Sequence, residues 1–276
     1  MDIHTLQLAL HGQPFGHTIE YQPSVPSTMP IARALAEEAF DPAQASGIVV
    51  VADEQTAGRG RLDRRWETPP GRALLMSVVV AGGHLPERPA QLPMIAGLAV
   101  LEAVMQADSL RDSGQAVDLR LKWPNDLVAV LPNGPVKLAG LLAESSLDSQ
   151  GIRYAVLGIG VNVNQRAEEL PVPRAGGLPP ASLYTLFGRE FAREEVLIAL
   201  CRSLSALLAA RNRPTAEEIH ARWQAALINL GHSVVVHSGG GEWRGQAVGT
   251  DVDGSLLVED ETGRRVAVAA GDVSVV

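Results

Sequence analysis

The chain has 276 residues, 46% of them hydrophobic, which suffices for one large domain and a second, small one. Its formal net charge of −8 argues against nucleic-acid binding, which needs a surplus of lysine and arginine to neutralise phosphates. The single cysteine, Cys201, excludes an intrachain disulfide and a multi-cysteine metal site. No secretory leader opens the chain and no apolar run reaches roughly 20 residues, so we expect a cytoplasmic protein without membrane spans.

The first part of the chain predicts a mixture of strands and helices. The run 47–52 is continuously apolar and β-branched, which is typical of a strand buried on both faces. A turn signal at 132–134 precedes a strand that we expect to pair with the next one as a β-hairpin. The expected helices are 30–40 and 90–107, and the expected strands are 47–52, 72–80, 118–121, 127–131, 136–144 and 152–163.

The second part of the chain changes character after Gly231. Before it, residues 166–181 predict a surface loop rich in proline and glycine, and 190–211 and 215–229 predict two helices. After it, short strand-like pieces are separated by glycine turns, which predicts a small antiparallel barrel or sandwich. These pieces are 233–237, 242–250, 255–259 and 264–269. We therefore expect a main domain at 1–230 and a small β-domain at 231–276.

The segment Gln55–Trp66 places four arginines within seven residues, beside Gly58 and Gly60. The arginines repel one another and need an anionic partner or solvent, while the glycines let the backbone present N–H groups to phosphate oxygens. Such a loop is expected to become ordered when its ligand binds. A solvated basic loop or an RNA-binding tract explains the composition equally well, and Trp66 is either a stacking platform or a buried anchor.

The segment Lys122–Asp126 lies between two predicted strands, and Pro124 must interrupt them. Lys122 can bind a phosphate, Asn125 can form hydrogen bonds, and Asp126 can hold Mg²⁺ or orient an incoming amine. This set of groups suits a nucleotide–metal site. The alternative is an ordinary polar turn.

Two further segments are weaker signals. Lys137 opens an otherwise apolar strand in which Gly140 leaves room for a ligand, although a lysine at a strand edge also explains it. The stretch Gly158–Asn162 permits close approach of a ligand, and Asn162 offers both a donor and an acceptor. The pair Ser27-Thr28 is typical of a helix cap.

Taken in order, four segments closely resemble the signatures of the biotin–protein ligase family. These signatures are Gln-x-x-Gly-Arg-Gly-Arg-x-x-Arg-x-Trp, Lys-Trp-Pro-Asn-Asp, Lys-Leu-Ala-Gly and Gly-x-Gly-x-Asn, present here at 55–66, 122–126, 137–140 and 158–162. The resemblance covers about residues 20–276. It implies an α+β fold, with a mixed β-sheet flanked by helices as in class II synthetases and biotin–lipoate ligases, and a small C-terminal SH3-like β-barrel.

The resemblance implies an ATP-dependent ligase that uses biotin, ATP and Mg²⁺. It forms biotinyl-5'-AMP and passes biotin to a lysine of the biotin carboxyl carrier protein of a carboxylase. Because the first signature follows only 26 residues, we expect a monofunctional ligase without a DNA-binding domain. A homodimer is a further family-level expectation. The alternatives are a lipoate or octanoate transferase of the same fold and a binding module without catalytic activity.

The resemblance also implies roles for individual residues. Arg61, Lys137 and Asp126 would carry the chemistry, with Asp126 facing the acceptor lysine and Asn125 and Asn162 near the metal. The implied biotin-binding residues are Ser27, Thr28, Gln55, Gly58, Arg59, Gly60, Arg61, Lys137, Gly140, Leu142 and Gly158. The implied ATP-binding residues are Arg61, Arg64, Trp66, Lys122, Asn125, Lys137 and Asn162. Two positions depart from the family pattern: Met29 stands where Asn or Asp is common, and Asp63 stands where glycine is usual.

Overall fold

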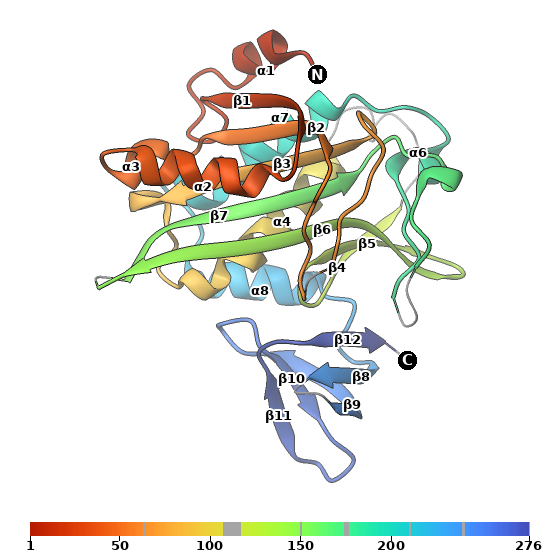
Figure 1. Cartoon of the computed structure of the whole chain (residues 1–276). Helices are drawn as coiled ribbons and strands as arrows, with labels where there is room; N and C mark the ends of the chain where they lie inside the picture. Colours follow the sequence, from red (N-terminus) through yellow and green to blue (C-terminus); the bar gives the residue numbers. More distant parts are fainter. Residues whose placement is uncertain are drawn as a thin grey trace.

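The computed structural model describes residues 1–62, 64–106, 117–149, 151–173, 177–209, 211–238 and 241–275. A seven-stranded mixed sheet forms the larger part, and a five-stranded antiparallel sheet lies at the C-terminal end (Figure 1). Asp63, one of the two departures from the family pattern, lies outside the described residues.

The large sheet has the strand order β1-β2-β3-β7-β6-β5-β4. Strands β1 and β2 are parallel and every other neighbouring pair is antiparallel, so the predicted mixed sheet and the β6–β7 hairpin are confirmed. Strand β1 was not expected, because Pro23 and the polar residues around it give no strand pattern. Proline has no backbone N–H to donate, and β1 tolerates this because it lies at the edge of the sheet. The strands are β1 Ile19–Val25, β2 Val49–Gln55, β3 Ala73–Ala81, β4 Asp118–Lys122, β5 Asp126–Leu131, β6 Gly134–Asp148 and β7 Gly151–Asn162.

Helices cover both faces of this sheet (Figure 1). On one face, α2 packs through Met29, Ala32 and Ala36. On the other face, α4 is buried on nearly all sides, as its continuously apolar sequence requires. The helices are α1 Ile3–Ala9, α2 Thr28–Glu38, α3 Pro42–Ala45, α4 Leu92–Gln106, α6 Leu183–Phe187, α7 Arg193–Leu204 and α8 Ala216–Ala226. No helix among the described residues combines the length and hydrophobicity needed to cross a bilayer.

The predicted helix 190–211 is shorter than expected. It begins at Arg193 and ends as an α-helix at Leu204, after which Ser205–Ala209 continue as a π-helical segment. Ser205 donates a hydrogen bond to the carbonyl of Cys201 four residues earlier, a contact that bends helices. Burial raises the pKa of the Cys201 thiol to about 12, which confirms a structural rather than a nucleophilic cysteine.

The C-terminal sheet has the strand order β11-β10-β9-β8-β12, and all its pairs are antiparallel. Four strands match the predicted pieces, and a fifth, β12, follows Gly271. The strands are β8 Ser233–Ser238, β9 Gly241–Thr250, β10 Leu256–Glu259, β11 Arg265–Val268 and β12 Asp272–Val275. The described pairings leave β11 and β12 at the two edges of this sheet.

The turn between β4 and β5 is fixed from two sides. The backbone N–H of Trp123 donates to Asn229 Oδ1 at 2.7 Å, and the Trp123 indole N–H donates to the carbonyl of Gly254 in the C-terminal sheet at 2.8 Å. Trp123 and Asn229 are both buried. These contacts hold the following residues, Asn125 and Asp126, in place at the end of β5.

Replacing Asn229 by alanine is expected to lower the free energy of unfolding by about 1–3 kcal/mol, because it leaves the buried Trp123 N–H without an acceptor. Urea denaturation of the purified variant measures the change. Asn133→Ala, at an exposed turn, is the control and should leave the midpoint unchanged. Equal stability of both variants would show that this hydrogen bond does not hold the turn.

Candidate active site

One cavity on the α2 face of the large sheet gathers the segments singled out in the sequence. It is lined by Ser27, Thr28, Met29, Gln55, Arg59, Gly60, Arg61, Arg64, Arg65, Trp66, Met76, Asn125, Lys137, Gly140, Leu141, Leu142, Gly158, Ile159 and Gly160. Every residue of the predicted biotin-binding set except Gly58 lies in this lining. Gly58 is buried behind it, where an added Cβ would meet the carbonyl oxygen of Trp66 at 2.4 Å.

The Ser27-Thr28 pair begins helix α2 and also faces the cavity. Ser27 is the N-cap, and its hydroxyl accepts from the N–H of Met29, so the helix-cap interpretation is confirmed. Thr28 contacts Gln55 Oε1 through its backbone N–H at 2.8 Å and through its hydroxyl at 3.1 Å. Ser77, which the sequence did not single out, lies 2.7 Å from the Thr28 hydroxyl.

The arginine–glycine loop folds as a small hairpin. The N–H of Gly60 donates to the carbonyl of Arg64 at 2.7 Å, and the N–H of Trp66 donates to the carbonyl of Gly58 at 3.0 Å. Arg59 and Arg65 face each other as an antiparallel bridge between these contacts. The described residues of 58–66, here called the flap, are thus joined to one another by backbone hydrogen bonds and lie over the sheet.

The arginines of the flap have different environments. Arg59 forms an ion pair with Glu144 on β6 at 3.1 Å, and Arg64 forms an ion pair with Asp272 on β12. Arg61 is half-buried, and its Nη1 has no hydrogen-bond partner among the described residues. Burial lowers the pKa of the Arg61 guanidinium. An unpartnered buried cation that lines a cavity is typical of an anion-binding site.

Trp66 rests on two glycines that face each other across β6 and β7. Gly140 and Gly160 are register partners, and a Cβ added to either would come within 2.7 Å and 2.6 Å of the indole ring, respectively. The indole N–H is buried without a partner, and Lys137 Nζ lies 5.6 Å from the ring centroid. The space expected for a ligand at Gly140 is thus taken by Trp66, which is both an anchored side chain and part of the cavity wall.

Met29 takes the space beside a third glycine of the cavity. A Cβ added to Gly158 would meet the Met29 sulfur at 2.8 Å. The side chain that departs from the family pattern is therefore a wall of the cavity, and it makes that wall apolar.

Lys137 lines the cavity and pairs with Asp126, which lies just outside this lining. Their Nζ and Oδ1 atoms are 2.7 Å apart, and both side chains are largely shielded from solvent. A second cavity shares Lys137, Arg64 and Asn125 with the first and adds Lys122 and Asp126. Burial lowers the pKa of Lys122, and the neighbouring cations lower it further. Three cations, Arg64, Lys122 and Lys137, thus face one crevice between the two sheets.

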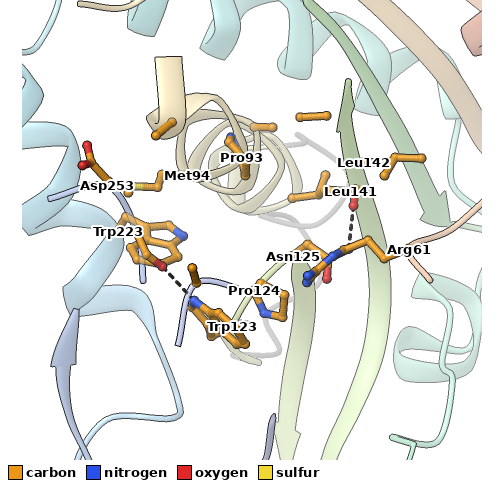
Figure 2. A pocket seen from close by; sticks show the side chains of 15 residues that line it. Arg61, Pro93, Met94, Trp123, Pro124, Asn125, Leu141, Leu142, Trp223 and Asp253 are labelled. Atoms are coloured by element: carbon orange, nitrogen blue, oxygen red, sulfur yellow. Dashed lines mark hydrogen bonds between the residues drawn. The ribbon is translucent and has the colours of Figure 1, made fainter. Parts of the chain in front are cut away.

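Asn125 lines both of these cavities and also a third one, which Figure 2 shows. The third cavity lies between the start of α4, the turn at Trp123 and the Asp253–Gly254 turn of the C-terminal sheet. Asn125 Nδ2 donates to the carbonyl of Leu141 at 2.5 Å, which ties the turn to β6. Arg61 lines the first and third cavities together with Asn125, so a ligand in either one meets the same guanidinium.

Two family models match this chain. A model of the biotin/lipoate A/B protein ligase family matches residues 21–162, and a model of the biotin protein ligase C-terminal domain matches residues 230–276. The chain belongs to the biotin/lipoate A/B protein ligase family.

Two relatives match over most of their own length. A biotin--[acetyl-CoA-carboxylase] ligase of Paracoccus denitrificans is 35% identical over 80% of this chain and 88% of its own. One of Mycobacterium tuberculosis is 35% identical over 84% of this chain and 80% of its own. The solved structure of the biotin protein ligase from Aquifex aeolicus in complex with biotin and ATP superposes with a TM-score of 0.71 at 27% identity, over 94% of this chain and 99% of that one.

One predicted residue of the family signatures is placed apart from the cavities. Asn162 is buried, its Nδ2 donates to the carbonyl of Ala181 at 3.0 Å, and its Oδ1 accepts from Gln165 at 2.7 Å. Both ends of the amide are therefore used within the segment that follows β7. The expected role of Asn162 in binding nucleotide or metal stays a prediction. Its contact with Ala181 holds that residue beside Lys137, which pairs with Pro180.

Proposed function

We propose that this chain is an ATP-dependent biotin–protein ligase. It forms biotinyl-5'-AMP from biotin and ATP, and then transfers biotin to a specific lysine of a biotin carboxyl carrier protein. The observation that carries the proposal is the single cavity in which the flap, the β4–β5 turn and the glycine-bearing strands β6 and β7 converge on Arg61 and Lys137. Two further findings support it: the chain belongs to the family, and its relatives are named as biotin--[acetyl-CoA-carboxylase] ligases.

The biotin ring would lie at the Ser27, Thr28 and Gln55 end of the cavity. Thr28 and Gln55 offer hydrogen-bonding groups there, while Met29, Leu142 and Gly158 make the surrounding wall apolar. A small apolar slot with a few polar groups at one end suits a bicyclic urea with a hydrocarbon tail. The tail would then point its carboxylate towards Lys137.

Activation of the carboxylate needs cations where negative charge gathers. As the biotin carboxylate attacks the α-phosphorus of ATP, the bond to pyrophosphate breaks, and the phosphoryl oxygens gain charge. Arg61 and Lys137 line this part of the cavity and would stabilise that charge. The flap would shield the resulting mixed anhydride from water, since its backbone hydrogen bonds already hold it over the sheet.

The nucleotide would occupy the side of the cavity that carries Trp66, Asn125 and the crevice cations. The indole wall can stack on a base, and Arg64 and Lys122 can bind the leaving phosphates. Among the described residues there is no cluster of three or more His, Cys, Asp or Glu side chains that could hold a metal. The few oxygen donors here fit a Mg²⁺ ion that is held mainly by the ATP phosphates, with Asn125 or Asp126 as a protein ligand. When bound, the ion would neutralise further phosphate charge.

Transfer to the acceptor would use the crevice between the two sheets. Asp126 is the carboxylate nearest to Lys137 and lines that crevice, so it would receive the approaching lysine ammonium and orient it. The ammonium would give one proton to Asp126 or to water, and the neutral amine would then attack the acyl carbon. The bond between that carbon and the phosphate oxygen breaks, AMP leaves as its anion, and the new amide nitrogen loses its second proton to water.

Gly160→Ala is expected to lower kcat/KM for ATP at least about tenfold, because the new methyl group displaces the indole of Trp66. Steady-state assays of carrier biotinylation with varied ATP measure this. The control is Gly249→Ala in the C-terminal sheet, where an added Cβ meets its nearest atom at 3.8 Å, an ordinary contact distance. Unchanged ATP kinetics in Gly160→Ala would remove Trp66 from the nucleotide site.

Three organisational features belong to the same proposal. We place the boundary between the catalytic domain and the small domain at residues 230 and 231, and we propose that the C-terminal sheet is an SH3-like barrel. We also propose a homodimer, to be tested by sedimentation of the protein with and without biotin and ATP.

The purified protein should add biotin to a carrier domain in the presence of ATP and Mg²⁺. Mass spectrometry of the carrier measures the gain, and lipoate in place of biotin tests the alternative substrate of this fold. Modification by lipoate alone would make the chain a lipoate ligase. No gain with either acid would leave a binding module.

A further inference from the structure

Ser77 is a polar residue inside an apolar strand. It lies in the middle of β3, whose nine residues are all buried, and its side chain is completely shielded from solvent. Among the described residues its hydroxyl has one partner, the Thr28 hydroxyl at 2.7 Å. A buried hydroxyl costs free energy unless it is hydrogen-bonded, so the contact with Thr28 is what makes Ser77 tolerable in this strand.

The orientation of Gln55 follows from Thr28. The backbone N–H of Thr28 can only donate, and it lies 2.8 Å from one end of the Gln55 amide. That end must therefore be the oxygen, Oε1, and not the NH₂ group. The Gln55 Nε2 group then points away from Thr28, with both of its hydrogens available elsewhere.

The hydrogen bond between the Ser77 and Thr28 hydroxyls has a defined direction. The hydrogen of the buried Ser77 hydroxyl needs an acceptor, and the Thr28 oxygen is the partner that the structure provides. Since Ser77 donates to Thr28, the Thr28 hydrogen is directed to Gln55 Oε1, 3.1 Å away. The three side chains form a one-way relay from Ser77 to Thr28 to Gln55.

We propose that Ser77 is a positioning residue that sets the hydrogen-bonding polarity of the substrate cavity. With the relay in place, Thr28 presents only a lone pair to the cavity, and Gln55 presents only N–H donors. A cyclic urea carries an N–H donor beside a carbonyl acceptor, and these two groups match that pattern. The inference rests on the proposed function, because it takes the biotin ureido ring as the ligand at this end.

The size of Ser77 also suits this place. It is the register partner of Gly158, whose surface is already covered by Met29. A larger hydrogen-bonding side chain would have to displace one of these neighbours. Removal of the hydroxyl leaves the neighbours in place but frees the Thr28 hydrogen bond, so Thr28 loses its fixed role as an acceptor.

Ser77→Ala is expected to raise the Kd for biotin about three- to tenfold, as one fixed hydrogen bond is lost, with the KM for ATP within twofold of wild type. Titration calorimetry gives the Kd, and the biotinylation assay gives the KM. Ser77→Cys, which keeps a weaker donor on a slightly larger atom, should fall between the two. The control is Ser46→Ala, another buried serine whose hydroxyl bonds His84 and the N–H of Ala81, and it should leave biotin affinity unchanged.

A double-mutant cycle with Thr28→Val separates the relay from simple packing. If Ser77 acts through Thr28, Ser77→Ala causes no further loss of affinity in the Thr28→Val background. Desthiobiotin, which keeps the urea but lacks the thioether ring, should lose affinity by the same factor as biotin. An equal loss in both backgrounds, or a matching rise in the KM for ATP, would overturn the relay. Failure of the wild-type protein to bind biotin would instead overturn the proposed function.

Discussion

Replacement of Arg61 by glutamine is expected to slow adenylate formation about 100-fold or more without destabilising the protein. The guanidinium is half-buried with an unpartnered Nη1, so the folded state bears the cost of its desolvation. Its removal should leave the free energy of unfolding unchanged or raise it by up to about 1 kcal/mol. The rate falls because a preorganised cation is lost where charge develops in the transition state.

The two readouts for Arg61 are the rate of pyrophosphate release with saturating biotin and ATP, and the urea midpoint of the same preparation. Arg120→Gln is the control, because Arg120 is exposed and, among the residues that the structure describes, pairs with Asp118 on its own strand. Loss of stability in parallel with loss of rate would show that Arg61 supports the flap rather than the reaction. Unaltered pyrophosphate release would exclude it from the chemistry.

Lys137→Ala is expected to lower the rate of adenylate formation about 100- to 1,000-fold, because in the proposed arrangement the lost ammonium faces the carboxylate and the α-phosphate. The same change leaves Asp126 without its cation at 2.7 Å, which should cost about 1–2 kcal/mol of stability. A loss of that size leaves nearly all molecules folded, so it does not account for the expected rate.

Lys137→Arg separates charge from position. The longer, planar guanidinium keeps the charge, but it cannot place it where the ammonium lies above the Trp66 ring. We expect partial activity, with a larger deficit in kcat than in the KM for biotin. If Lys137→Ala released pyrophosphate at the wild-type rate, the role of Lys137 in activation would be wrong.

Much of the fold could be predicted from the sequence, because the spacing of apolar residues and the positions of turn residues determine where most helices and strands lie. The buried strands 47–52 and 72–80 and the helix 90–107 all appear near their expected bounds. Strand β1 escaped prediction since Pro23 and polar residues give it no regular alternation. Helix α1 was missed as well, and its sequence buries only Leu6.

The site was less predictable, because its contacts join residues far apart in the chain. The signatures gave most of the lining, but no local pattern tells that Trp66 fills the space at Gly140 and Gly160. The amide of Asn162 is occupied by Ala181 and Gln165, contacts that only the folded loop creates. Ser77 left one trace, a lone hydroxyl in an otherwise apolar buried strand. The role proposed for Ser77 depends on its contact with Thr28, which only the folded structure shows.

The central claim is that the cavity beneath the flap makes and holds biotinyl-5'-AMP. Native mass spectrometry after incubation with biotin, ATP and Mg²⁺, without carrier, tests it directly. The account predicts one adenylate per chain, which discharges onto carrier domain added after ATP is removed. Biotin attached covalently to the enzyme itself is easy to tell from bound adenylate, since Lys122 and Lys137 are the only lysines of the chain. A carrier that gains biotin only while free ATP is present, from a protein that retains no adenylate, would contradict the account.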